Sequence, residues 1–174
     1  MAGLDMQYIA ELVAQAQEGD INAFAELFAA TCQNQYAFAR QLLGDDFLAQ
    51  QALQSAYTEA IKKLYVLRDP MLVVVWLSRI VLKSCFNLQA EEMGKQRTLE
   101  NHTLKIRGAV YSARQVMTLP LGESQALLLR HLCGMKTGTI ASLLEMKRAE
   151  VRRCMRNGVR RLAALSAEMG GEQG

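Results

Sequence analysis

Seven basic side chains lie within fifteen residues near the end of this 174-residue sequence, and Glu150 is the one acidic residue among them. The basic residues are Lys147, Arg148, Arg152, Arg153, Arg156, Arg160 and Arg161. Spacings of four and seven place most of them on one side of a helix. An arginine fork can bridge guanine O6 and N7 in a major groove, and the same cation can neutralise a phosphate. The pattern therefore favours binding of duplex DNA over a solvated charged face.

Two further predicted helices precede the basic helix and make it the last part of a helix-turn-helix module. The three helices cover residues 123–133, 137–144 and 147–165, with Gly134 ending the first and Glu145 in the second turn. A helix of this kind needs an apolar side that packs on its neighbours. The predicted apolar positions of the basic helix are Val151, Cys154 or Met155, Gly158, Leu162 and Leu165.

The first half of the chain predicts four more helices, which together would form a compact bundle. They cover residues 4–17, 20–43, 45–64 and 71–88. Asp20 is placed to cap the second helix, Gly44 to end it, and Asp45 or Asp46 to cap the third. The fourth helix is apolar nearly all round through Trp76 and is expected at the centre of the bundle.

Apolar and aromatic residues of these helices recur at helical spacing, which indicates packing in the core rather than stacking on bases. On the third helix the predicted apolar stripe is Leu48, Ala52, Leu53, Ala56, Tyr57, Ala60, Ile61 and Leu64. The aromatic residues with this interpretation are Phe24, Phe28, Tyr36, Tyr57 and Trp76.

The formal charge of +3 conceals an asymmetry between the two halves of the chain. Residues 1–90 hold six basic and nine acidic side chains, whereas residues 91–174 hold fourteen basic and eight acidic ones. The net charges of −3 and +6 predict a polyanionic partner for the second half only. The charged segment 90–101 is expected to be an exposed loop. The predicted divisions are a first helical domain, a linker and a helix-turn-helix domain at residues 4–90, 91–113 and 114–167.

No arrangement of residues indicates catalysis, a cofactor or a metal. The side chains considered for these roles lie far apart or lack a ligand spacing: Cys32, Cys85, Cys133, Cys154, His102 and His131. A protein that is not an enzyme, with free thiols buried or half-buried, is the expectation. The longest apolar run, residues 71–77, is much shorter than the roughly 20 residues of a spanning helix. A cytoplasmic protein without membrane insertion is therefore expected.

Six segments in a fixed order resemble those of the two-domain sigma factors of bacterial RNA polymerase, of the extracytoplasmic-function type. They are QAQEGDINAFAELF (15–28), GDDFLAQQALQSAYTEA (44–60), WLSRI (76–80), LP (119–120), TIASLLEM (139–146) and VRRLAAL (159–165). Within the second segment Ala49, Gln54, Tyr57 and Ala60 are in register with the family pattern. The resemblance extends over nearly the whole chain except the linker and the tail, and its specificity comes from order and spacing together.

The resemblance implies an all-α fold, with an N-terminal four-helix bundle like sigma region 2 and a C-terminal domain like sigma region 4. It implies initiation of transcription, with duplex promoter DNA, core RNA polymerase and an anti-sigma protein as partners. The implied reader of the upstream (minus 35) element comprises Lys147, Arg148, Arg152, Arg153 and Arg156. The implied polymerase contacts are Gln50, Gln51, Gln54 and Ser55. The implied contacts with the downstream (minus 10) element are Arg79, Lys83 and Asn87.

The chain departs from the family pattern where Gln50, Gln51 and Ser55 replace acidic residues, and where Glu145 replaces a turn glycine. Two alternatives to a sigma factor remain open at this point. One is a sigma-like DNA-binding regulator that no longer engages core polymerase. The other is a protein-interaction module whose arginine helix binds an acidic partner.

Overall fold

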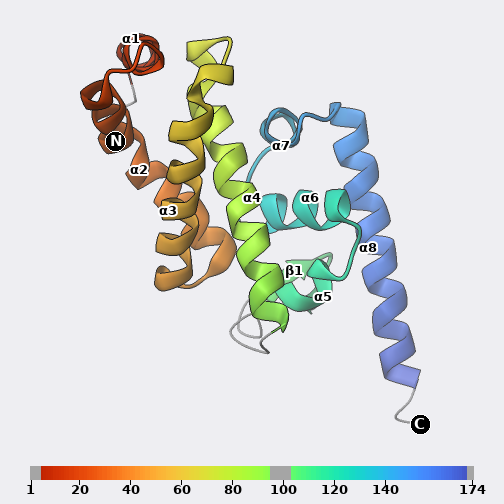
Figure 1. Cartoon of the computed structure of the whole chain (residues 1–174). Coiled ribbons are helices and arrows are strands. Elements are labelled where there is room, and N and C mark those ends of the chain that lie inside the picture. The colour runs from red at the N-terminus through yellow and green to blue at the C-terminus, as the bar shows by residue number, and fades with distance from the viewer. Residues whose placement is uncertain (1–4, 95–102, 172–174) are drawn as a thin grey trace. The chain divides into compact units, whose positions relative to one another are not determined.

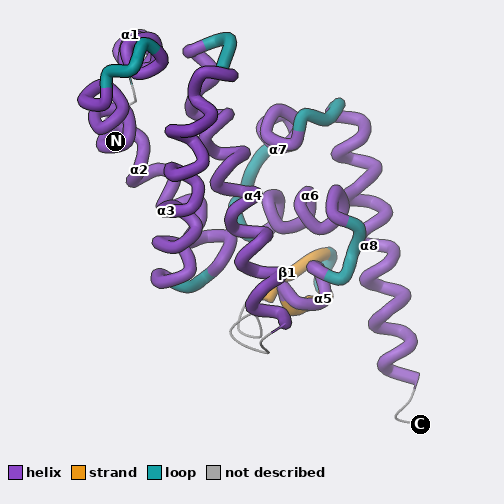
Figure 2. The backbone as a smooth tube through the Cα atoms, viewed as in Figure 1, coloured by secondary structure: helices purple, strands orange, loops and turns teal. Residues whose placement is uncertain are grey.

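The computed structural model describes residues 5–94 and 103–171, and it divides the chain into two compact units, Met1–Leu88 and Gln89–Gly174. Both units are built mainly from helices (Figure 1), so the all-α prediction is confirmed. Besides the helices, the described residues form one two-stranded hairpin, which belongs to the second unit (Figure 2).

The first unit contains the predicted four helices. Their observed bounds are α1 (Met6–Gln17), α2 (Ile21–Leu43), α3 (Asp46–Lys63) and α4 (Val73–Gly94), with short 3-10 turns at Leu64–Val66 and Pro70–Leu72. Asp20 and Asp45 cap α2 and α3 through their carboxylates, and Gly44 ends α2 with a left-handed φ of 67°. The capping and stop signals in the sequence are therefore confirmed.

Buried polar contacts hold the bundle together in addition to its apolar core. Tyr57 of α3 and Thr31 of α2 share a hydrogen bond of 2.6 Å between their hydroxyl groups. Gln35 of α2 exchanges hydrogen bonds with Ser78 of α4, at 3.0 Å and 3.2 Å. These pairs satisfy polar atoms that would otherwise be costly to bury, and they fix how α3 and α4 face α2.

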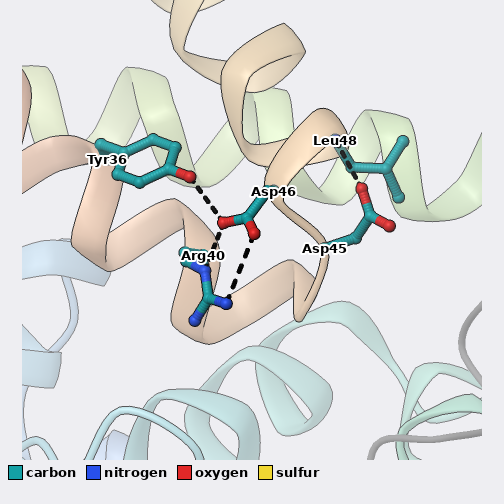
Figure 3. Close-up of polar contacts among 5 residues, drawn as sticks. All are labelled: Tyr36, Arg40, Asp45, Asp46 and Leu48. Atoms are coloured by element: carbon teal, nitrogen blue, oxygen red, sulfur yellow. Dashed lines mark hydrogen bonds and ion pairs between the residues drawn. The ribbon is translucent and has the colours of Figure 1, made fainter.

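A polar cluster closes the corner between α2 and α3 (Figure 3). Asp46 accepts a hydrogen bond of 2.6 Å from the Tyr36 hydroxyl and an ion-paired hydrogen bond from Arg40 Nε. Arg40, followed by Tyr36, holds the pKa of Asp46 below its usual value. The neighbouring Asp45 accepts from the Leu48 backbone N–H at 2.8 Å and starts α3. The corner thus sets the direction in which α3 leaves α2.

The helix α4 extends further than the sequence predicts. The segment 90–101 is expected as a loop, but α4 remains helical to Gly94, and residues 95–102 lie outside the described part. Among the described residues, one segment, Pro70–Glu92, has the length and composition of a membrane span, and an 18-residue window within it has a mean hydropathy of 1.6. Its side chains at Val73, Leu77 and Val81 are buried in the protein, and a core helix has the same composition.

The second unit, which includes the last residues of α4, contains a hairpin that the sequence does not predict. Strands β1 (Thr103–Ile106) and β2 (Ala109–Ser112) pair antiparallel, and Arg107 and Gly108 form the turn with φ of 50° and 87°. Positive φ at both turn positions matches the right-handed twist of the strands. Leu104, Ile106 and Tyr111 are buried, so the hairpin contributes to the core of this unit.

Four helices follow the hairpin. They are α5 (Ala113–Met117), α6 (Leu121–His131), α7 (Thr137–Leu144) and α8 (Arg148–Gly171). The helix α5 is not predicted from the sequence, and α6 both begins and ends two residues before its predicted bounds. The bounds of α7 are as predicted, whereas α8 continues six residues beyond the predicted end at residue 165.

The helix α8 packs against α5, α6 and α7 through a few small or apolar residues. Val151 and Leu162 are buried, and a Cβ at Gly158 would lie 2.8 Å from Leu127 Cδ1, so α6 and α8 approach closely there. Leu165, predicted on the buried side, is 39% exposed, so the packed side of α8 does not extend to the predicted end of the helix. Glu145 ends α7 in the left-handed region at φ 56°, a conformation that disfavours side chains with a Cβ.

Candidate nucleic-acid interface

The structure places all seven cations of the basic segment on the exposed part of α8 or at its start. They are Lys147, Arg148, Arg152, Arg153, Arg156, Arg160 and Arg161. The apolar residues Val151 and Leu162 are buried on the other side of the same helix. The helix therefore separates a packing face from a cationic face, as the sequence predicts. The five predicted contacts of the upstream element, residues 147, 148, 152, 153 and 156, all lie on the cationic face.

Two carboxylates form ion pairs with arginines of this face and so reduce its positive charge. Arg161 Nε lies 3.2 Å from Oε2 of Glu123, a buried residue of α6 whose Oε2 makes no hydrogen bond. Arg161 thus supplies the countercharge that a buried carboxylate needs, and it also links α8 to α6. Arg153 Nη2 lies 3.8 Å from Glu150 Oε1. The sequence gives no sign of the pairing between Glu123 and Arg161, because the two residues are 38 positions apart.

Two local features shape the start of α8. An open hollow of about 530 Å³ is lined by Lys147, Ala149, Glu150, Arg153 and Arg156. The guanidinium of Arg148 lies beside the first turn of α7 instead. A Cβ built at Gly138, in that turn, would be 3.2 Å from Arg148 Nη2. Of the five predicted DNA-binding residues, Lys147, Arg153 and Arg156 therefore line the hollow and Arg148 lies beside α7, while Arg152 is exposed on α8 outside both.

The predicted polymerase contacts all lie on α3, but only two of the four line the same groove. Gln50, Gln51, Gln54 and Ser55 are all exposed. Gln50 and Gln54 line a groove of about 470 Å³, whereas Gln51 and Ser55 are not among the residues that form it. The other lining residues come from α2 and α3: Phe24, Phe28, Leu53, Tyr57, Thr58 and Ile61.

This groove corrects the prediction that the aromatic residues of α2 and the apolar stripe of α3 are simply core. Phe28 is 39% exposed and Ile61 is 50% exposed, while Phe24 and Leu53 are half-buried. Tyr57 is buried, and its ring meets Phe28 edge to face at 4.6 Å between centroids. Burial raises the pKa of Tyr57 to about 12. The helical spacing is as predicted, but among the described residues of the first unit no helix covers this side of the stripe.

The predicted contacts with the downstream element lie on α4 at intervals of four residues. Lys83 and Asn87 are exposed, and Arg79 is half-buried. Lys83 Nζ lies 3.3 Å from Glu59 Oε1, which also accepts a hydrogen bond of 2.7 Å from Lys63. Lys63, and to a smaller extent Lys83, lowers the pKa of Glu59. Glu59 therefore partly neutralises the positive charge of Lys83.

The four cysteines are free thiols, with Cys85 buried and Cys32, Cys133 and Cys154 half-buried, as the sequence predicts. Burial raises the pKa of Cys133 to about 12, which keeps this thiol protonated at neutral pH. The described residues contain no group of three or more His, Cys, Asp or Glu side chains that could hold a metal ion.

The two all-α units together have the fold of a two-domain sigma factor. The chain is similar to CnrH, solved in complex with the cytosolic domain of CnrY, at 20% identity and a TM-score of 0.56, covering 92% of this chain and 98% of that one. It is also similar to the sigma factor RpoE, solved with the anti-sigma factor NepR from Bartonella quintana, at 15% identity and a TM-score of 0.51, covering 84% and 98%. No protein-family model and no curated protein matches the sequence.

Proposed function

We propose that this protein is a sigma factor that binds core RNA polymerase and directs it to promoters in the cytoplasm, with α8 reading the upstream promoter element. The observation that carries the proposal is the cationic face of α8, which a helix-turn-helix unit presents to solvent. Such a face supplies phosphate neutralisation and guanine recognition with the same residue type. The sigma-factor fold of the chain supports the same function.

The role of α8 is tested by measuring duplex binding of the full chain over a range of salt concentrations. Arg152→Ala with Arg156→Ala should weaken binding and reduce the slope of log affinity against log salt by about 1.8, if both side chains neutralise phosphates. Lys105→Ala is the matched control, because Lys105 is an exposed cation of the same unit on β1. Equal affinities and slopes for all three proteins would contradict DNA binding by α8 and favour an acidic protein as its partner.

The groove between α2 and α3 is the surface we propose for core polymerase. A continuous apolar groove on one side of a helical bundle accepts the apolar face of an amphipathic helix. Gln50 and Gln54 add neutral donors and acceptors at its edge, and Gln50 stands where the family pattern has an acidic residue. The same surface therefore supports polymerase binding that depends on apolar burial more than on ion pairs.

Polymerase binding is tested by capture of core enzyme on the immobilised full chain. Ile61→Glu places a charge in the groove and should abolish capture. Ile21→Glu makes the same change at an isoleucine that is 76% exposed and lies outside the groove, so capture should persist. Capture that survives both substitutions would contradict the groove as the docking surface.

A second candidate function is a sigma-like DNA-binding regulator that no longer engages polymerase. The neutral Gln50, Gln51 and Ser55 favour it, since each is exposed where an acidic residue would pair with a basic partner. Under this alternative the native chain captures no core enzyme, and Gln50→Glu, Gln51→Asp and Ser55→Glu together create capture.

An anti-sigma protein is the further partner that we propose. RpoE was solved with the anti-sigma factor NepR, and CnrH was solved with the cytosolic domain of CnrY. An inhibitor of this class should compete with core polymerase for the chain. Co-expression of such an inhibitor should reduce capture of core enzyme, and undiminished capture would argue against the inhibitor.

A further inference from the structure

Glu150 is the one acidic residue within the basic segment 147–161, and the structure places it inside the hollow at the start of α8. Glu150 lines this hollow together with Lys147, Arg153 and Arg156, and its side chain is 45% exposed. The carboxylate therefore remains accessible to a molecule that occupies the hollow.

The contacts that Glu150 makes within the protein are weak. Its Oε2 accepts from the Lys147 backbone N–H at 3.3 Å, and its Oε1 lies 3.8 Å from Arg153 Nη2. Both distances are long for a hydrogen bond, and an exposed ion pair of this length adds little stability. A first-turn carboxylate also interacts favourably with the helix dipole, but that effect needs no particular position on the cationic face. The contacts within α8 thus leave the carboxylate with acceptor capacity to spare.

A carboxylate can only accept hydrogen bonds at neutral pH, so it repels a phosphate and attracts a donor. In a major groove the donors are cytosine N4 and adenine N6, and acidic side chains accept from cytosine N4. Arg153, beside Glu150, presents the opposite preference, for the acceptors of guanine. The hollow therefore combines an acceptor and a donor fork, which suits the edges of adjacent base pairs and does not suit the sugar-phosphate backbone.

We propose that Glu150 is a specificity-determining residue, whose carboxylate reserves the hollow at the start of α8 for a base edge with an exposed amino group and excludes phosphate from it. This inference rests on the proposed function, in which α8 binds duplex DNA. The surrounding cations supply affinity for any sequence, and Glu150 lowers the affinity for registers that place a phosphate over the hollow.

The test compares the full native chain with Glu150→Gln, which keeps the size of the side chain and removes its charge. Each protein selects from a duplex library with a randomised central segment, and the bound duplexes are sequenced. Affinities are then measured over a range of salt concentrations for the best duplex and for a scrambled duplex. Glu168→Gln is the matched control, since Glu168 is an exposed acid on α8 outside the basic segment.

The native chain and Glu168→Gln should share a base preference that Glu150→Gln loses or changes by about tenfold or more at one or two adjacent positions. The scrambled duplex should bind Glu150→Gln more tightly, with a log-log salt slope steeper by about 0.9. Unchanged preferences with a uniform change of affinity would overturn the specificity role and leave DNA binding by α8 intact. A native chain that enriches no sequence at low salt would instead overturn the proposed function, and this inference with it.

Discussion

The close crossing of α6 and α8 at Gly158 gives a sharp test of how the basic helix is held. A Cβ at this position would lie 2.8 Å from Leu127 Cδ1 and 3.4 Å from Glu123 Cβ. Carbon atoms normally approach to about 3.5–4.0 Å. Leu127 is fully buried, so its methyl group can move away only by displacing the side chains packed around it. Gly158→Ala should therefore force the two helices apart.

Two opposing effects set the magnitude of this change. Alanine in the interior of a helix is favoured over glycine by about 1 kcal/mol. Overpacking of a filled core costs about 1–3 kcal/mol. The net result is a loss of about 1 kcal/mol, or about 4–8 °C in the melting temperature of a domain of this size. Duplex affinity should fall as well, because α8 is displaced.

Far-UV circular dichroism reports the unfolding of both units, while the single tryptophan, Trp76 of α4, reports the first unit alone. Gly158→Ala should lower the melting of the second unit and leave the Trp76 fluorescence transition unchanged. In a Leu127→Ala background the same substitution should stabilise the protein, because the truncated side chain leaves room for the new methyl group. If Gly158→Ala in the otherwise native chain increased the free energy of unfolding by the full amount of about 1 kcal/mol expected from helix propensity, the close crossing would be refuted.

Three more predictions concern single positions. The raised pKa of Tyr57, about 12, means that stability is full below about pH 10 and falls by roughly 1.4 kcal/mol per pH unit between about pH 10 and 12. Tyr57→Phe, which lacks the Thr31 hydrogen bond, should be about 1 kcal/mol less stable in urea at pH 8, with a deficit that shrinks above pH 10. Gly138→Ala should stabilise α7 by about 0.5–1 kcal/mol yet weaken duplex binding a few-fold, because its Cβ displaces Arg148. Glu145→Gly should raise the melting temperature by relieving a left-handed backbone that costs about 1–2 kcal/mol.

Each of these predictions has a clear contrary result. A Tyr57→Phe deficit that stays constant from pH 8 to pH 11 would mean that the phenol ionises at its ordinary pKa. Unchanged duplex affinity in Gly138→Ala would place Arg148 outside the DNA-binding surface. No gain in stability for Glu145→Gly would mean that contacts of the Glu145 side chain offset the backbone cost.

The sequence alone determined the features that depend on neighbours within about four residues. Asp20 and Asp45 signalled helix starts through their short acceptor side chains, and Gly44 signalled a stop by its freedom to adopt positive φ. The bounds of α7 and the cationic face of α8 followed from the same local rules, since helical periodicity fixes which side chains share a face. The all-α fold follows directly from such signals added along the chain.

Tertiary structure decided which of those faces are covered. Helical spacing placed Phe28 and Ile61 on an apolar stripe, but only the packing of the bundle leaves them at the edge of a groove beside Gln54. Likewise, Arg161 belongs to a basic run in the sequence, and the crossing of α6 and α8 alone brings Glu123 to it. Local periodicity specifies one helix at a time, whereas contacts between distant residues depend on how helices pack, which no short stretch of sequence encodes.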